Sequence, residues 1–159
     1  MLNVNIICVG NLKEKFFTDA LSEYKKRLGR YCKFEVVELP EEKIADNVTQ
    51  SQIDKTLKKE GEKILSKIGK SDFVVAMCIE GKQLSSEELS KKIEDISLTN
   101  STVNFVIGGS WGLSDDVKKR ADMRLSVSKM TFPHQLFRVM LAEQIYRAFS
   151  ITANAKYHK

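Results

Sequence analysis

Residues 127–137, VSKMTFPHQLF, combine several features of a ligand site. Just before them, residues 124–128 alternate polar and apolar side chains, as a half-buried strand does. Thr131 fits a helix N-cap, and Pro133 suits a first helical turn, where its missing N–H costs nothing. A strand that ends at a helix N-terminus offers unpaired N–H groups and a positive dipole end. Because ligands of open α/β sheets bind at the carboxyl ends of strands, we expect a site here, although an ordinary strand-to-helix corner shows the same local pattern.

Two further loops follow predicted strands and could border the same site. Residues 77–81 and 108–112 each come at the end of an apolar run, and the glycines of the second loop allow close backbone approach. Neither loop carries the GxGxxG fingerprint of dinucleotide sites or the GxxxxGK[ST] of a P-loop. Taken alone, the glycine pair Gly108 and Gly109 is explained more simply by a tight turn. Trp111, in the same run, receives no role.

The basic tail holds a second set of side chains that could do chemistry. Tyr157 can stack on a nucleobase, and His158 can exchange a proton near neutral pH. Lys156 and Lys159 can bind phosphates. A frayed basic terminus is the alternative interpretation of any last few residues.

Other reaction classes find little support. No serine lies in GxSxG, and the two histidines have no serine or cysteine at a telling spacing. With so few histidines a metal site is not expected. Cys8, Cys32 and Cys78 lie in or beside apolar runs, as reduced core cysteines do. The 159 residues carry a net charge of +5, which fits an anionic partner such as RNA. We expect one domain over residues 1–159, a cytoplasmic location, and no signal peptide or membrane span.

Strand and helix patterns alternate along the whole chain. Strands are predicted at residues 4–9, 33–39, 72–79, 102–107 and 124–128, and helices at 14–29, 52–68, from about 85, at 114–121 and from 133. Residues 80–82 are expected to form a turn. This alternation predicts an α/β fold with a mostly parallel sheet flanked by helices.

The last helix is apolar on nearly every side between residues 136 and 149. A helix that is apolar all round is buried all round. One small sheet covers only one face, so the second face is expected to meet a second subunit. A central helix of a monomer is the alternative interpretation.

Long segments of the sequence resemble one family. VIGGSWGL (106–113), SKMTFPHQLFRVMLAEQIYRA (128–148) and the final YHK, with VGNLKEKFF and EGKQLSSEE, are similar to bacterial SPOUT-class methyltransferases that modify a pseudouridine of large-subunit ribosomal RNA. The resemblance implies a SPOUT fold with a C-terminal trefoil knot, a homodimer, and S-adenosylmethionine as cofactor. The cofactor positions carried over are Met77, Gly108, Val127, Ser128, Lys129, Met130, Thr131 and Phe132.

The same resemblance implies methylation of N3 of a pseudouridine in 23S rRNA, within the ribosome and without a metal. The enzyme must place the methyl donor and the base in line and favour the deprotonated base. Tyr157 and His158 are the candidates for contact with the flipped base, and RNA contacts are expected from His134, Arg138, Lys156 and Lys159. A non-catalytic ribosome-associated RNA-binding factor is the alternative, and so is a related enzyme with another RNA target.

Overall fold

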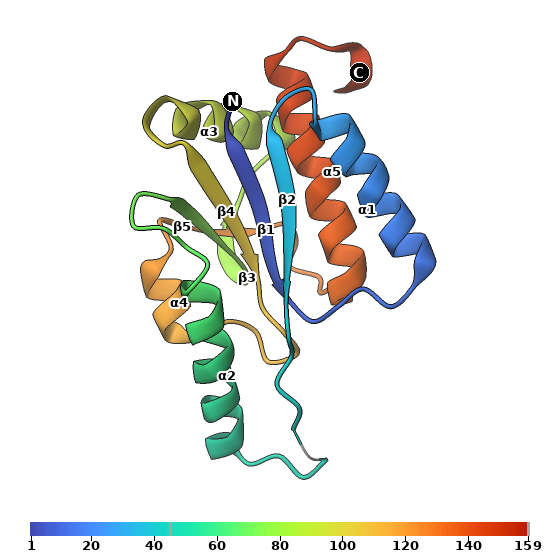
Figure 1. Cartoon of the computed structure of the whole chain (residues 1–159). Helices are drawn as coiled ribbons and strands as arrows, with labels where there is room; N and C mark the ends of the chain where they lie inside the picture. The colour runs from blue at the N-terminus through green and yellow to red at the C-terminus, as the bar shows by residue number, and fades with distance from the viewer. Residues whose placement is uncertain (45, 159) are drawn as a thin grey trace.

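The computed structural model contains one five-stranded parallel sheet (Figure 1). It describes residues 1–44 and 46–158, and of His158 only the backbone. In the order β2-β1-β4-β3-β5, the strands are β1 (Asn3–Val9), β2 (Lys33–Leu39), β3 (Phe73–Gln83), β4 (Thr102–Ile107) and β5 (Met123–Ser126). The predicted parallel α/β fold is therefore confirmed, while the trefoil knot remains a prediction.

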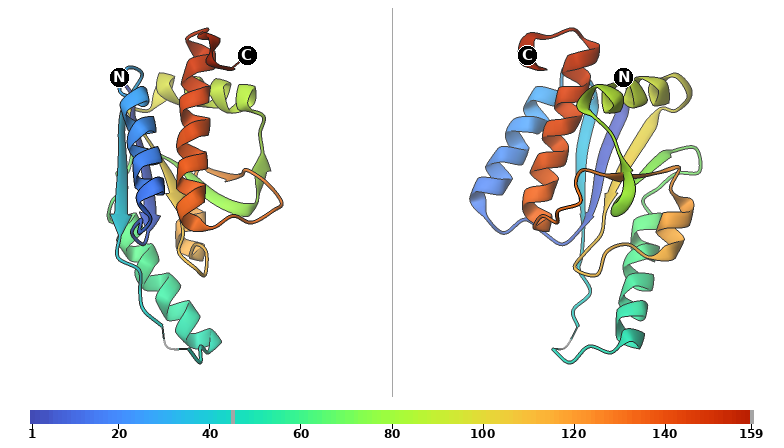
Figure 2. Two further views of the ribbon diagram at one scale, coloured as in Figure 1. Left: turned by 90° about the vertical axis from the view of Figure 1, so that its right-hand side faces the viewer. Right: turned by 180° about the vertical axis from the view of Figure 1, so that it is seen from behind.

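Helices cover both faces of the sheet. They are α1 (Lys15–Leu28), α2 (Gln50–Leu65), α3 (Ser86–Thr99), α4 (Asp115–Arg120) and α5 (His134–Thr152), followed by the short 3-10 helix η1 (Lys156–His158). Side chains of α1, α3 and α5 share one apolar core with one face of the sheet, and those of α2 and α4 share a smaller core with the other face. Figure 2 shows α1 and α5 side by side, with α2 on the opposite side of the sheet. The strands run so that all their carboxyl ends meet at one edge.

Local signals at the helix starts are partly confirmed. Ser85 and Glu88 form a capping box at the start of α3, as the sequence indicates. The start of α5 differs from the prediction: Pro133, rather than Thr131, is the residue before the helix, and no side chain caps it. The residues before Pro133 therefore belong to a loop and not to the helix.

The turn predicted at residues 80–82 is wrong, because β3 continues through it to Gln83. An irregularity between Met77 and Lys82 lets both residues pair with Leu125 of β5. Gly81 makes this second approach possible: a Cβ there would lie 2.6 Å from the carbonyl carbon of Leu125. Strand periodicity alone does not reveal such a close backbone contact.

Helix α5 lies between α1 and α3, and this explains much of its apolar surface. Leu141, Ala142, Ile145 and Ala148 are buried in the larger core. Phe149 stacks on Tyr31 from outside the helix, with ring centroids 5.9 Å apart. These two flanking helices cover part of the surface for which the sequence predicts a second subunit. The homodimer remains a prediction that this packing neither requires nor contradicts.

Arg138 does not face a ligand, so the expectation that it contacts RNA is corrected. Its side chain is 1% exposed. The guanidinium donates to the backbone oxygens of Val9 (3.0 Å) and Gly10 (2.8 Å) and to a carboxylate oxygen of Glu38 (3.0 Å). That same oxygen of Glu38 also accepts from the backbone N–H of Leu12, at 2.8 Å. Arg138 therefore ties α5 to the ends of β1 and β2.

Replacing Arg138 tests this role. We expect Arg138→Met to lower the free energy of unfolding by about 3 kcal/mol, because two backbone carbonyls and a carboxylate lose a buried charged donor. Arg30→Met removes an exposed arginine and should change stability little. Denaturant unfolding of both variants measures the difference, and equal stabilities would contradict the anchoring role.

Candidate active site

A pocket of about 490 Å³ opens at the carboxyl ends of β3, β4 and β5. This volume lies within the range of small-molecule and cofactor sites. All three loops named from the sequence contribute to its wall. The predicted cofactor residues that line it are Met77, Gly108, Val127, Ser128, Met130, Thr131 and Phe132. Lys129 is exposed and does not line the pocket, whereas His134, expected to contact RNA, does.

The glycine loop forms one wall through a tight turn. The N–H of Gly112 donates to the oxygen of Gly109 at 3.1 Å, and Gly112 has a φ of 84°, which favours glycine. A Cβ at Gly108 would meet the backbone oxygen of Gly112 and lie 2.5 Å from its carbonyl carbon. Gly108 is thus needed because its own loop folds back against it. The sequence instead suggested that the cofactor leaves no room for a side chain.

Side-chain hydrogen bonds hold the loop between β5 and α5. The hydroxyl of Ser126 donates to the oxygen of Ser128 at 2.9 Å. The hydroxyl oxygen of Ser128 accepts from the N–H of Met130, also at 2.9 Å. The segment is therefore a bonded turn rather than the continued strand predicted to residue 128. Its shape lets Val127 and Met130 border the pocket while remaining exposed.

The acidic side chain that lines the pocket, Glu80, is paired with a lysine. Lys118 lies 2.6 Å from the carboxylate of Glu80, and both line the pocket. The hydrogen bond from Lys118 holds the pKa of Glu80 below its ordinary value. Burial, then the charge of Glu80, raises the pKa of the Cys78 thiol, so Cys78 lacks the lowered pKa of a nucleophilic cysteine.

Glu60 of α2 supports the glycine loop from behind, and sequence reasoning missed it. The residue is 4% exposed, and one carboxylate oxygen accepts from the N–H of Glu42 at 3.2 Å. The other oxygen is buried and has no hydrogen-bond partner among the described residues. It lies 3.2 Å from where a Cβ of Gly109 would be. Its only sequence signal is its place on the apolar side of α2, three residues after Leu57.

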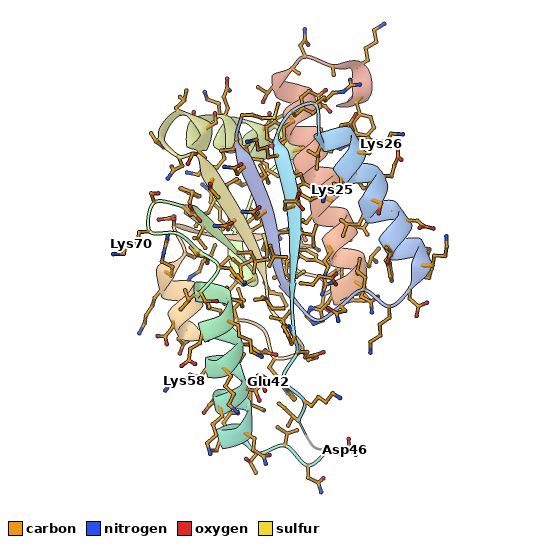
Figure 3. The ribbon with its side chains drawn as sticks, in the orientation of Figure 1. Lys25, Lys26, Glu42, Asp46, Lys58 and Lys70 are labelled. Carbon is orange, nitrogen blue, oxygen red and sulfur yellow. The ribbon has the colours of Figure 1, made fainter. Side chains whose placement is uncertain are left out.

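The electrostatic surroundings of Glu60 raise its pKa. Burial contributes most, and the nearby carboxylates of Glu41 and Glu42 add to it. Glu42 is itself paired with Lys63 at 2.7 Å, and Figure 3 shows Glu42 beside α2. Glu41 accepts from the hydroxyl of Ser110 at 2.9 Å, which connects this acidic group to the glycine loop.

The tail is not brought to the pocket of the same chain. The hydroxyl of Tyr157 donates to the carboxylate of Glu143 at 2.7 Å, and its ring packs edge-on against Tyr146 with centroids 4.7 Å apart. The guanidinium carbon of Arg147 lies 5.0 Å from the centre of the same ring. These contacts are on the C-terminal half of α5, whereas the residues of α5 that line the pocket, His134 and Phe137, are in its first turn. Lys156 is exposed there, and the predicted roles of the His158 side chain and of Lys159 lie outside the described residues.

The described part of the chain offers no metal cluster and no membrane-spanning helix. Among residues 1–44 and 46–158, no group of three or more His, Cys, Asp and Glu side chains could hold a metal ion. Within the same residues, every helix is too short or too polar to cross a membrane.

Sequence comparisons assign the chain to known relatives. A family described as "Predicted SPOUT methyltransferase" matches residues 2–158. A Clostridium perfringens (strain SM101 / Type A) protein named Ribosomal RNA large subunit methyltransferase H 1 is 54% identical over 159 residues, covering 99% of this chain and 100% of that protein. A Limosilactobacillus reuteri (strain DSM 20016) protein named Ribosomal RNA large subunit methyltransferase H is 52% identical with the same coverage.

Two solved structures share the fold at low identity. A probable methylase family protein from Haemophilus influenzae Rd KW20 aligns with a TM-score of 0.56 and 11% identity, over 98% of this chain and 70% of that chain. A ribosomal RNA small subunit methyltransferase E from Neisseria gonorrhoeae, bound to S-adenosyl methionine, aligns with a TM-score of 0.50 and 11% identity, over 91% and 65%.

The self-contact of the glycine loop predicts the result of a substitution. We expect Gly108→Val to weaken S-adenosylmethionine binding and also to lower the free energy of unfolding by about 1–3 kcal/mol, because the loop must move away from the added side chain. Ser110→Ala changes the same loop without displacing its backbone and should keep most of the affinity. Calorimetric titration and denaturant unfolding test both. A Gly108→Val protein of normal stability that fails to bind would instead show that the side chain blocks the ligand directly.

The raised pKa of Glu60 predicts a pH dependence of stability. Folding favours the protonated carboxyl, so its contribution is fully present below the unfolded pKa and is lost as pH rises through the higher folded value. Wild type should therefore lose stability relative to Glu60→Gln as pH rises from about 4 towards neutrality. Glu62→Gln, on the exposed side of α2, should follow wild type over the same range. Parallel curves for wild type and Glu60→Gln would contradict the assignment.

Proposed function

The chain belongs to the SPOUT methyltransferase family, and from this premise we propose that it transfers a methyl group from S-adenosylmethionine to large-subunit ribosomal RNA. The observation that carries the proposal is the full-length likeness to proteins named as that enzyme, at 52–54% identity. We place the cofactor in the pocket at the carboxyl ends of β3, β4 and β5. The whole chain would act as one methyltransferase domain in the cytoplasm.

The finer proposal is that the target is N3 of a pseudouridine in 23S rRNA, methylated within the ribosome. The support is the YHK ending together with the FPHQL and EQ-YRA pattern of residues 132–148. A pseudouridine in a loop can leave its stack and enter a pocket, which a paired base does only at greater cost.

The described residues fit the proposed cofactor. Apolar walls come from Met77, Leu125 and Phe132, and the glycine loop brings backbone groups close to the space between them. Gly108 and residues 127–132, apart from the exposed Lys129, would hold the cofactor. When bound, S-adenosylmethionine supplies an electrophilic methyl group on a cationic sulfonium.

The chain's own residues would place the RNA base and favour its deprotonated form. N3 of pseudouridine is a weak nucleophile until it loses its proton, so nearby positive charge helps the reaction. Lys129, on the loop beside the pocket, would supply such a charge, whereas Lys118, which lines the pocket, is paired with Glu80. Most of the rate enhancement would come from orientation of the two reactants.

A homodimer would bring the tail into the reaction. Within one chain, Tyr157 is held on Glu143 and Tyr146 in the C-terminal half of α5, while the first turn of α5 lines the pocket, so Tyr157 would serve the pocket of another copy. The outward side of α5 carries Leu136, Val139 and Met140, which are only half-buried in one chain. This strip could cover the same strip of a partner. Tyr157 and His158 would then contact the base, with Lys156 and Lys159 on phosphates.

Several lysines lie on separate parts of the fold. Figure 3 labels Lys25 and Lys26 at the end of α1, Lys58 on α2, and Lys70 beyond it. This distribution fits a large RNA partner that surrounds the protein, and it also keeps open the alternative of a non-catalytic RNA-binding factor.

One paired experiment tests the proposal. Wild type and a variant lacking residues 157–159 are incubated with labelled S-adenosylmethionine and with ribosomes that lack the modification. We expect wild type to label one pseudouridine of 23S rRNA. The truncated protein should lose most transfer while its cofactor affinity changes by about 1 kcal/mol or less, because the tail serves the RNA. Its stability should fall only slightly.

Each outcome has a clear meaning. Labelling of another nucleotide would refute the pseudouridine target, and labelling of another RNA would refute the large-subunit substrate. Ribosome binding without any transfer would favour the non-catalytic alternative. Full transfer by the truncated protein would show that the tail takes no part in the reaction.

A further inference from the structure

Exposed apolar side chains gather at the mouth of the pocket. Ile79 (56% exposed), Trp111 (45%), Val127 (39%) and Met130 (74%) all line it. These four make up half of the large apolar side chains that are exposed among the described residues. Such a cluster beside a cavity is typical of a binding surface rather than of random surface exposure.

Hydrogen bonds hold the backbone of the turn that carries Trp111, whereas its indole ring has no aromatic or cationic partner among the described residues. The N–H of Gly112 donates to the oxygen of Gly109 and closes the turn on which Trp111 lies. Next to it, the hydroxyl of Ser110 is held by the carboxylate of Glu41 at 2.9 Å. Among the described residues, no aromatic or cation–π contact involves the indole. The turn therefore holds a flat apolar ring ready for a partner.

The charges near this ring indicate what kind of partner it would be. Lys118 and His134 line the same pocket, Lys129 lies next to Met130, and the charge of Glu80 is matched by Lys118. A flat apolar surface among basic groups fits a nucleobase with its phosphates. The proposed homodimer would bring only the basic tail of a second copy to this pocket, and with a net charge of +5 per chain that tail would serve the same RNA rather than cover the ring.

We propose that Trp111 is an RNA-binding residue that stacks on an unstacked nucleobase of the RNA at the mouth of the pocket. The inference rests on the proposed function, because it takes RNA as the substrate. Gly108, at the inner end of the same loop, is buried, whereas Trp111 is at the exposed tip. Trp111 therefore meets the RNA, while the inner part of the loop faces the cofactor.

The chain contains a single tryptophan, so its fluorescence reports on this ring alone. The full-length protein is titrated first with S-adenosylmethionine and then with a 23S rRNA fragment that carries the proposed target pseudouridine. We expect little change in emission with the cofactor and strong quenching with the RNA. Trp111→Ala should weaken binding of the fragment about tenfold, and Trp111→Phe should recover most of that loss. Both variants should keep the affinity for S-adenosylmethionine.

Leu98→Ala is the matched control, because Leu98 is an exposed apolar residue of α3 that does not line the pocket. It should bind the fragment like wild type. Methyl transfer is measured in parallel: the KM for RNA should rise in Trp111→Ala while the cofactor KM does not change.

Several results would overturn the inference. Emission that changes with protein concentration alone would assign the ring to a second copy, and full quenching by S-adenosylmethionine would assign it to the cofactor. If the Trp111→Ala variant binds the RNA as tightly as wild type does, Trp111 has no role in RNA binding. If the fragment binds and quenches but ribosomes that lack the modification receive no methyl group, the proposed function fails while this contact is retained. A wild-type protein that binds neither the fragment nor those ribosomes refutes both.

Discussion

The pocket depends on one buried charge, the guanidinium of Arg138. It joins three segments that are far apart in the sequence: the end of β1 at Val9 and Gly10, the end of β2 at Glu38, and the first turn of α5. Such a contact is costly to break, because the buried carbonyl of Val9 would be left without its donor. The loop that lines the pocket ends where α5 begins, so this anchor also fixes the position of Phe132 and His134.

A second set of contacts supports the glycine loop from the opposite face of the sheet. Glu60 lies beneath Gly109, and Glu41 binds Ser110, so the loop is held between α2 and the pocket. A buried carboxylate with one unpaired oxygen is destabilising when ionised, which is why its pKa is raised. The protein keeps this unfavourable group next to the turn that presents Trp111. The side of the loop that faces α2 is thus held by contacts, while Trp111 on its other side is exposed.

Much of the fold could be predicted from residue patterns. Alternating apolar runs placed all five strands within a few residues, except that β3 extends to Gln83. The loops after β3, β4 and β5 were expected to border one site, because parallel strands end at a common edge, and the pocket is there. Seven of the eight cofactor positions implied by the family resemblance line that pocket, and Lys129 does not.

Tertiary structure alone decided the direction and the partners of the charged groups. Arg138 is one of few polar residues in an apolar helix, and only the folded chain shows that it points inward to β1 rather than outward to RNA. Glu60 lies among lysines, and only the packing of α2 places it under Gly109. Tyr157 packs on α5 of its own chain because it contacts Glu143 and Tyr146, and its position in the tail does not reveal these contacts. Sequence determines periodicity and local turns because these depend on neighbouring residues. The partners of a buried charge come from distant segments, which meet only when the sheet and its helices have packed.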